Sequence, residues 1–456
     1  MSEALRRELG PYDAIAVVVG AIVGVGIFFT PSRVAALTGS DSLFLLTWVV
    51  GGLVALAGAM TFAELGGIYP RTGGQYDILR DAYGPAIGFV YVTCNATATQ
   101  AGAIGIIAIV CVQNAAVALS GQALDGAALL AAAVSVSIVI ACANAAGVRQ
   151  GARIQNATVV AKIGALVAVV VIALFFHEPA AATPVADEPP EYGPLAAIAA
   201  GLVPALFSFG GWQIALWVGG EVRDPQRNVP RAIMVGTAIV VVVYLGANWA
   251  YLHLLGHAGM ASSEALAADA VTAGVGDAGR RLVAGAVALS ALGVLNAQLL
   301  GGPRLLLALA RDGRFFRPFA SIHPRWGTPV PAITLLCGTA MALLLAAGAD
   351  GIDRLLTGVV LIDAVFFVLT GLATIVLLNE HPRAGRPVRM PLFPLVPLLF
   401  VLAEAGAAVG AWMDPSVRGA AIIGIGWIAA ASVIYALWFR KPSPRPSAPS
   451  DPPDQT

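Results

Sequence analysis

Long runs of apolar residues, separated by short polar segments, occupy most of the chain. A helix needs about 20 consecutive apolar residues to cross a bilayer, whose hydrocarbon core is about 30 Å thick. The pattern therefore predicts an all-α integral membrane protein with twelve transmembrane helices. The runs lie near residues 14–37, 42–69, 84–119, 126–147, 154–176, 194–220, 230–256, 280–309, 329–349, 353–379, 391–412 and 417–439.

The composition indicates the same class of protein. Hydrophobic residues make up 58% of the 456 residues and charged residues 11%, which is too few to cover the surface of a soluble protein of this size. The formal net charge is zero, so nothing favours a nucleic-acid partner. The apolar run after Arg6 and Arg7 is longer than the core of a signal peptide, and we interpret it as a retained first span.

Catalytic and metal-binding patterns are not evident in the sequence. The four cysteines all fall inside apolar runs without a C-x-x-C spacing, which favours neither a disulfide framework nor a zinc site. His253 and His257 are four residues apart, but no further metal ligand lies near them in the sequence. A P-loop, a dinucleotide-binding fingerprint and a Ser/His/Asp arrangement are also missing. The sequence thus predicts a protein that is not an enzyme and needs no cofactor.

The distribution of cations predicts the orientation. If the N-terminus is cytoplasmic, the cytoplasmic segments hold nineteen of the 26 Lys and Arg residues, the outer segments hold five, and Lys162 and Arg304 lie within spans. This bias predicts a multi-pass protein of the cell (inner) membrane with both termini in the cytoplasm. The cytoplasmic ends are residues 1–13 and a Pro/Ser-rich tail at 440–456, which we expect to be disordered.

Two of the twelve segments contain residues that break helices. The first segment has Gly20, Gly24 and Gly26 near its middle, and the sixth has Pro204 followed by Gly210 and Gly211. Glycine weakens a helix and proline removes a backbone donor. Backbone groups freed in this way need partners, so such breaks persist in a membrane only within protein or beside a cavity. Gly20-x-x-x-Gly24 taken alone would also fit close helix packing.

The spacing of the two breaks favours a binding site over simple packing. They recur at matching positions of two five-span halves, and an odd number of spans makes the second half inverted. Interrupted helices at matching places of inverted halves indicate a substrate site near the middle of the membrane. Half-helix N-termini suit a carboxylate, and half-helix carbonyls suit an ammonium group. This pair of properties weakly favours a zwitterionic amino acid as substrate.

Five stretches resemble the L-amino-acid transporter family of the amino acid–polyamine–organocation superfamily. Together they run from the first segment to the ninth, and a PLFPLVPLL stretch in the eleventh segment also fits. They are GAIVGVGIFFTP at 20–31, FAELGGIYPRTGGQYDILRDAYGP at 62–85, VRQGARIQNATVVAK at 148–162, FSFGGWQIALWVGGEVRDPQRNVPRAI at 207–233, and LGVLNAQLLGGPRLLLALARDGRFF at 292–316 followed by HPRWGTPVPAI at 323–333.

The resemblance implies a LeuT-type fold and a site at the two breaks. The first five-helix repeat would span 14–176, the inverted second repeat 194–379, and two additional helices 391–439. A bundle of segments 1, 2, 6 and 7 would rock against segments 3, 4, 8 and 9. The substrate contacts carried over from the family are Ile22, Val23, Gly24, Val25, Gly26, Phe207, Ser208, Phe209, Gly210 and Gln213, with Phe207 as an aromatic gate.

Three positions bear on specificity and coupling. Val25 stands where the family usually has a small hydroxyl residue, and Gln213 stands where asparagine is frequent, so a side-chain donor at position 25 is missing. Lys162 matches a lysine that occupies the region of bound sodium in related transporters. It lies too deep in its segment to reach the membrane surface easily, and it is expected to tether segments 1 and 8 to segment 5.

Several other polar residues lie within the predicted spans. Asp363 and Glu404 are either proton sites or, as we favour, hydrogen-bonded carboxylates inside the bundle. Asn296 and Gln298 are expected to join helices. Asn95 and Thr99 either face the cavity or pack between helices, and the sequence favours neither role. Glu64 and Glu221 are expected to pair with loop arginines.

The sequence therefore predicts a sodium-independent secondary transporter of neutral L-amino acids, working by exchange or with a proton. The alternatives are a transporter of cationic amino acids or polyamines, which would favour a carboxylate in the breaks, and a membrane amino-acid sensor without a transport cycle. The expected partners are a small-molecule amino acid and the lipid bilayer. The loop near SGQALDG has no cysteine, so no covalent partner subunit is expected, and the oligomeric state stays open.

Overall fold

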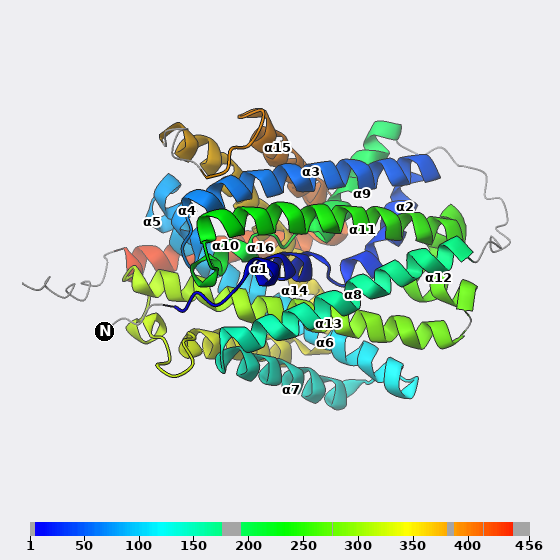
Figure 1. Cartoon of the computed structure of the whole chain (residues 1–456), viewed down its shortest axis with the longest axis horizontal. Coiled ribbons are helices and arrows are strands. Elements are labelled where there is room, and N and C mark those ends of the chain that lie inside the picture. The colour runs from blue at the N-terminus through cyan, green and yellow to red at the C-terminus, as the bar shows by residue number, and fades with distance from the viewer. Residues whose placement is uncertain (1–4, 176–192, 276, 381–386, 414, 441–456) are drawn as a thin grey trace, which may run out of the picture.

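The computed structural model describes residues 5–175, 193–275, 277–380, 387–413 and 415–440. Within these residues the regular structure is helical, apart from one isolated bridge between Leu9 and Val222. The long helices run roughly along the longest axis of the molecule (Figure 1). The predicted disordered tail lies outside the described residues except for Arg440.

The first half of the chain folds into the five predicted segments, but the first and third are not regular throughout. The third contains a π-helical stretch, η2, that the hydrophobic pattern does not indicate. The elements are α1 (Pro11–Ile22), η1 (Gly26–Phe28), α2 (Thr30–Thr38), α3 (Asp41–Ile68), α4 (Gly74–Tyr83), α5 (Pro85–Cys94), η2 (Asn95–Thr99), α6 (Gln100–Ser120), α7 (Gly126–Ala145) and α8 (Val148–Phe175).

The second half is also helical, and two of its long helices change direction at a glycine. Gly256 in α11 and Gly348 in α14 have positive φ values of 65° and 67°, and the second of them separates the predicted ninth and tenth segments. The elements are α9 (Pro194–Phe209), α10 (Ile214–Trp217), η3 (Gly219–Glu221), α11 (Pro225–Ser262), α12 (Leu266–Val275), α13 (Asp277–Arg311), η4 (Arg317–Ala320), α14 (Val330–Glu380), α15 (Leu395–Met413), α16 (Pro415–Ile434) and η6 (Tyr435–Phe439).

Length and composition identify ten helices of the described chain that can cross a membrane. Two further apolar helices, Pro11–Ile22 and Leu395–Gly410, are shorter than this criterion requires. Ten of the twelve predicted segments thus correspond to helices long enough to cross a membrane, and the other two contain shorter helices. The first segment is short because its helix ends at the predicted break.

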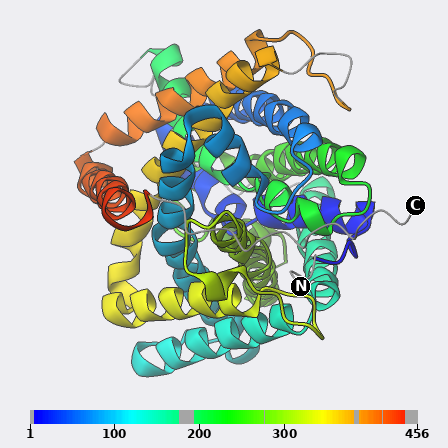
Figure 2. The same ribbon diagram turned by 90° about the vertical axis from the view of Figure 1, so that its left-hand side faces the viewer.

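The bundle has two ends. We call the end that carries Leu9, α4, η3 and η4 the N-terminal face, which lies at the left in Figure 1 and faces the viewer in Figure 2. The other end, with α12, is the opposite face. At the N-terminal face the Leu9 N–H donates to the Glu221 carbonyl at 2.9 Å, and the Arg223 N–H donates to the Leu9 carbonyl at 2.9 Å. The start of the chain is therefore attached to the end of the sixth segment.

Helix α1 lies in the middle of the bundle (Figure 1). It packs against α8, α10, α11 and α13, and its residues from Ala16 to Ile22 are buried. Gly20 allows part of this packing, because a Cβ there would lie 1.7 Å from Nε2 of Gln155 on α8. Gly20 thus serves helix packing, while the break itself begins three residues later, at Val23.

Candidate functional site

The first break lies between Ile22 and Gly26, as the glycine pattern predicts. α1 ends at Ile22, the next three residues are not helical, and η1 begins at Gly26. Among the described residues, the N–H groups of Val25 and Gly26 make no backbone hydrogen bond. They precede the turns of η1 and α2, where the helix dipole is positive. The break therefore presents donors suited to an anion.

The side chain of Lys162 binds backbone carbonyls in and around this break. Its Nζ donates to the carbonyls of Gly20 at 2.9 Å, Val23 at 2.6 Å and, more weakly, Ser290 at 3.4 Å. The side chain is fully buried. Lys162 thus ties α8 to α1 and α13, in the arrangement predicted for it.

Two further side chains bind the same stretch of backbone, and neither was predicted from the sequence. The Ser290 hydroxyl lies 3.2 Å from the carbonyl of Val23 and 3.1 Å from that of Gly24. The Tyr244 hydroxyl lies 3.0 Å from the carbonyl of Ile22 and 3.2 Å from that of Ser208, so it stands between the two breaks. Most carbonyls of the first break consequently already have a donor from α8, α11 or α13.

The second break lies at Gly210 and Gly211 rather than at Pro204. Pro204 remains inside α9, which ends at Phe209. Gly211 has φ 133°, and a Cβ there would lie 2.8 Å from the Ala21 carbonyl and 2.9 Å from the Ile22 nitrogen. The backbones of the two breaks therefore touch at a point that only glycine permits.

A cavity of about 250 Å³ lies against both breaks. Its walls also come from α6, α13, α14 and α15. Of the ten predicted contact residues, eight line it, namely Ile22, Gly24, Val25, Gly26, Phe207, Ser208, Gly210 and Gln213. Phe207 remains 57% exposed, so its ring does not seal the cavity.

Two predicted contact residues do not line this cavity. The carbonyl of Val23 is bound by Lys162, and its side chain is buried. Phe209 is fully buried, with its ring 5.8 Å from Trp48 and 5.2 Å from Tyr244 between centroids. The Phe209 ring therefore packs against these aromatic side chains and does not line the described cavity. Gln213 lines the cavity, but its Oε1 also accepts from the Gly211 N–H at 3.1 Å.

The remaining walls of the cavity carry several polar side chains. Thr99 and Gln100, at the junction of η2 and α6, line the cavity, whereas Asn95 does not. Asp363 and Glu404 line it as well, and within the described residues Glu404 makes no hydrogen bond, unlike the hydrogen-bonded carboxylate that we favoured. The walls are therefore apolar only in part.

Two comparisons with known proteins show the family of the chain. The model of the family described as amino acid permease matches residues 9–444. The chain belongs to the amino acid permease family. A large neutral amino acids transporter small subunit 2 from Oryctolagus cuniculus is 30% identical, over 96% of this chain and 82% of the relative. The serine/threonine exchanger SteT of Bacillus subtilis is 28% identical, over 87% of the chain and 89% of the relative, and an Asc-type amino acid transporter 1 of Mus musculus is 29% identical, over 92% and 79%.

This permease is a transporter of the amino acid–polyamine–organocation superfamily and not an enzyme.

Among the described residues, no group of three or more His, Cys, Asp or Glu is arranged to hold a metal ion. The ring of His253 stacks on Trp249, with 5.3 Å between centroids. His257 lies 3.5 Å from the Asp41 carboxylate. The two histidines thus have separate surroundings.

Interhelical hydrogen bonds hold the permease core together near the first break. Asn296 donates to the Gly151 carbonyl at 3.0 Å and to Oε1 of Gln155 at 2.7 Å, and it accepts from Asn144 at 2.9 Å. Asn296 therefore joins α13 to α7 and α8, which confirms its predicted role.

Two acidic residues near the N-terminal face bind partners that the fold brings to them: Glu221 binds an arginine within a span, and Glu64 binds a backbone N–H group. Glu221 forms an ion pair with Arg304, which lies within a span, and both side chains are fully buried. Glu64 accepts from the Met390 N–H at 2.9 Å. The prediction for Glu221 is wrong about the partner, because sequence position does not reveal which arginine the fold brings near.

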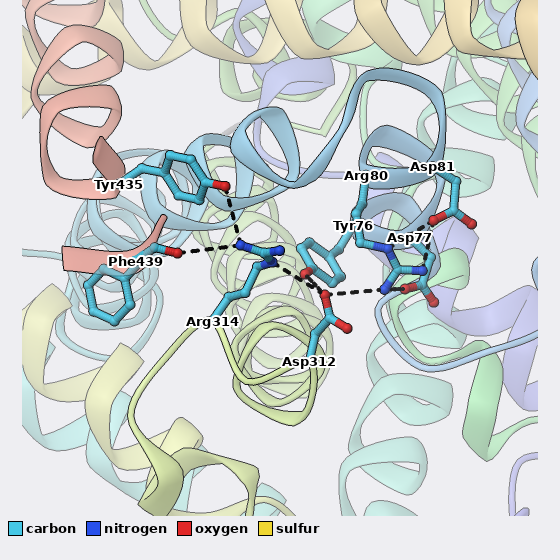
Figure 3. Close-up of polar contacts among 8 residues, drawn as sticks. All are labelled: Tyr76, Asp77, Arg80, Asp81, Asp312, Arg314, Tyr435 and Phe439. Atoms are coloured by element: carbon cyan, nitrogen blue, oxygen red, sulfur yellow. Dashed lines mark hydrogen bonds and ion pairs between the residues drawn. The ribbon is translucent and has the colours of Figure 1, made fainter. Parts of the chain in front are cut away.

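A network of charged residues on α4 covers the N-terminal face of the permease. Arg80 lies 2.9 Å from Asp77, 2.8 Å from Asp81 and 3.6 Å from Asp312 at the end of α13. The Tyr76 hydroxyl donates to the same Asp312 at 2.8 Å. These contacts fasten α4 to the end of α13 (Figure 3).

The network continues to the last helix of the described chain. Arg314 lies between Asp312, at 3.8 Å, and the C-terminal segment η6 (Figure 3). It donates to the Tyr435 hydroxyl at 3.2 Å and the Phe439 carbonyl at 3.4 Å. Burial raises the pKa of Asp77 to about 6, although the charges of Arg80 and Arg71 lower it.

Proposed function

We propose that the chain is a secondary transporter of neutral L-amino acids that works by alternating access and does not require sodium. The observation that supports this most directly is the cavity between the two breaks. The breaks offer backbone groups but no charged side chain, and backbone groups recognise what all amino acids share. The relatives named large neutral amino acids transporter and serine/threonine exchanger agree with this substrate class.

The carboxylate of the substrate would bind the free N–H groups of Val25 and Gly26. These groups lie at the N-terminal end of η1 and α2, so the helix dipole assists. The ammonium group would bind carbonyls at the C-terminal end of α9, near Phe207. The carbonyls of the first break are less suitable, because Lys162, Tyr244 and Ser290 already donate to most of them.

The family supports two inverted five-helix repeats at 14–176 and 194–379, followed by two additional helices, which makes twelve spans in total. We place the N-terminal face in the cytoplasm, in accordance with the distribution of cations. The described conformation would then be closed toward the cytoplasm, by the Leu9 backbone, the Glu221–Arg304 pair and the α4 network. Exposure of Phe207 fits a cavity that opens toward the outside.

Coupling would be by exchange or by a proton, with Lys162 in place of a bound cation. The Nζ of Lys162 binds the Gly20 carbonyl in the last turn of α1 and the Val23 carbonyl in the first break, as a metal cation would. A fixed ammonium group at this point makes a sodium ion unnecessary.

The decisive experiment is uptake of labelled amino acids into proteoliposomes. We expect alanine, serine, threonine and leucine to enter vesicles loaded with unlabelled neutral amino acid, and amides of the same amino acids to compete poorly. Empty vesicles, with and without a pH gradient, separate exchange from proton coupling. Binding of an amino acid without any uptake would support a sensor instead, and equal competition by decarboxylated amines would contradict the carboxylate contact.

A further inference from the structure

Two carboxyl groups face the substrate cavity from the wall across from the breaks. Asp363 on α14 and Glu404 on α15 both line it. Glu404 is 6% exposed, and it lies close enough to Asp363 for their charges to interact. The two residues are 41 positions apart in the sequence, and the fold brings both to the same cavity.

These carboxyl groups have no cationic partner in the cavity. Its lining residues include no Lys, Arg or His. Over the described part of the chain, Glu404 has neither an ion pair nor a hydrogen bond, and Asp363 has only the nearby hydroxyl of Thr99. Two carboxylates in an apolar cavity are costly unless a positive group accompanies them.

Other acceptors in the same cavity lack a donor as well. Gln100 is 2% exposed and lines the cavity, and its Oε1 has no hydrogen-bond partner among the described residues. The buried Oε1 of Gln298, on α13, is in the same situation. A buried acceptor without a donor costs about 1–3 kcal/mol. The wall therefore presents carboxylate and amide oxygens to a ligand that supplies several donors.

We infer that Asp363 and Glu404 form a binding site for a primary ammonium group at the end of a substrate side chain, so that the cavity also accepts cationic amino acids such as lysine and ornithine. An ammonium group carries three donors and one positive charge, which matches this set of acceptors. The inference rests on the proposed function, because the breaks would hold the α-carboxylate and α-ammonium groups while the carboxyl pair holds the far end of the side chain.

A diamine offers the same ammonium group without a carboxylate. Binding of both ammonium ends by acceptors alone would make the chain a diamine transporter rather than an amino-acid transporter. Cadaverine is lysine without its carboxylate, so a comparison of the two compounds distinguishes binding of a diamine from binding of a cationic amino acid. Norleucine, which has the length of lysine without its charge, measures what the apolar walls contribute.

The test is competition against labelled alanine in proteoliposomes at pH 7.5, with lysine, ornithine, norleucine and cadaverine. We expect lysine to compete, and Asp363→Asn and Glu404→Gln each to raise the ratio of the lysine to the norleucine inhibition constant at least tenfold. Asp125→Asn removes an exposed carboxylate before α7 and should leave this ratio unchanged. Lysine-dependent thermal stabilisation of the detergent-purified protein, lost in the two variants, would give the same answer without transport.

The outcomes are distinct. If alanine is transported and norleucine competes but lysine does not, the ammonium site is wrong while the proposed function stands. If uptake of alanine then follows a pH gradient and loses this dependence in both variants, the pair carries a proton instead, which also overturns the inference. If cadaverine competes as well as lysine, the ammonium site stands and the carboxylate contact proposed for Val25 and Gly26 is wrong.

Discussion

The guanidinium of Arg304 binds the carboxylate of Glu221 through two hydrogen bonds. Nε lies 2.9 Å from Oε2 and Nη2 lies 3.0 Å from Oε1, and both side chains are fully buried. The pair joins α13 to η3, which follows the second break and the short helix α10. It is thus a fixed point between the eighth and sixth segments at the N-terminal face.

Glu221→Gln should strongly destabilise the described conformation. The substitution leaves the Arg304 charge buried without an anion, which typically costs about 3–5 kcal/mol. Thermal unfolding in detergent measures the effect. Glu8→Gln is the control, because Glu8 pairs with an arginine that is 61% exposed and such a pair contributes about 0–1 kcal/mol. Equal unfolding midpoints for the two variants would contradict the importance of the buried pair.

Gly211→Ala should abolish most amino-acid binding while the protein remains folded. A Cβ at this position meets the Ala21 carbonyl at 2.8 Å, and φ 133° is unfavourable for alanine, so the two breaks must separate. Gly164→Ala is the matched control, since no atom of another residue lies within 4 Å of a Cβ there. We expect at least a tenfold loss of affinity for Gly211→Ala in a binding assay and none for Gly164→Ala. Equal affinities would show that contact of the breaks is not needed.

Phe207→Ala should reduce the transport rate at least tenfold with little effect on folding. Its ring lines the cavity and is the candidate gate, and a transport cycle requires the site to close. The expected readout is initial uptake by protein that elutes as a single species in gel filtration. Phe175→Ala, at the exposed end of α8, serves as the control aromatic substitution. Normal uptake by Phe207→Ala would exclude Phe207 as the gate.

Sodium should not be required for uptake. The Lys162 ammonium group already binds the Gly20 and Val23 carbonyls, so a second cation at this point would meet repulsion. Replacing external sodium by choline should leave the initial rate of uptake unchanged within about twofold. Lys162→Ala should lose uptake in both salts, because these carbonyls lose their donor. A strict dependence of the wild-type rate on sodium would refute the assignment of Lys162 as a cation substitute.

The stability of the N-terminal face should depend on pH through Asp77. Its folded-state pKa of about 6 lies above the unfolded value near 3.8, so the folded protein binds more protons between these values. By linkage, this group contributes stability at low pH that is lost as the pH rises through about 6. The groups that face it are Arg80, Arg71, Asp81 and Asp312.

The measurement is the thermal midpoint in detergent between pH 4.5 and 7.5. The decline of stability with rising pH should be smaller in Asp77→Asn than in the wild type. Asp81→Asn, which removes another carboxylate from Arg80, is the control for loss of an ion pair. An unchanged pH profile in Asp77→Asn would assign the titration to another group.

The broken helices could be predicted from the sequence because glycine in an apolar run has a local meaning. Their position could be predicted less well. Pro204 sits in a regular helix, since a proline inside a membrane helix can be accommodated when neighbours satisfy the freed carbonyl. Gly211 sets the break because of what it touches, and that contact is with Ala21, far away in the sequence.

The polar wall of the cavity was less accessible to sequence analysis. The segments that carry Asp363 and Glu404 are apolar around their whole circumference, so no polar face distinguishes the side toward the cavity from the side toward lipid. For the same reason the sequence does not show that the Phe209 ring packs against Trp48 and Tyr244 instead of lining the cavity. The partner of Glu221 depends on a contact between residues 83 positions apart.

The Tyr244 hydroxyl carries a single proton and stands between two acceptors, the Ile22 carbonyl at 3.0 Å and the Ser208 carbonyl at 3.2 Å. It can donate to only one of them at any moment. Because the two distances are similar, one hydrogen bond is kept whichever of the two carbonyls accepts it. A single side chain of α11 thus holds both broken helices, and it donates to only one of them at a time.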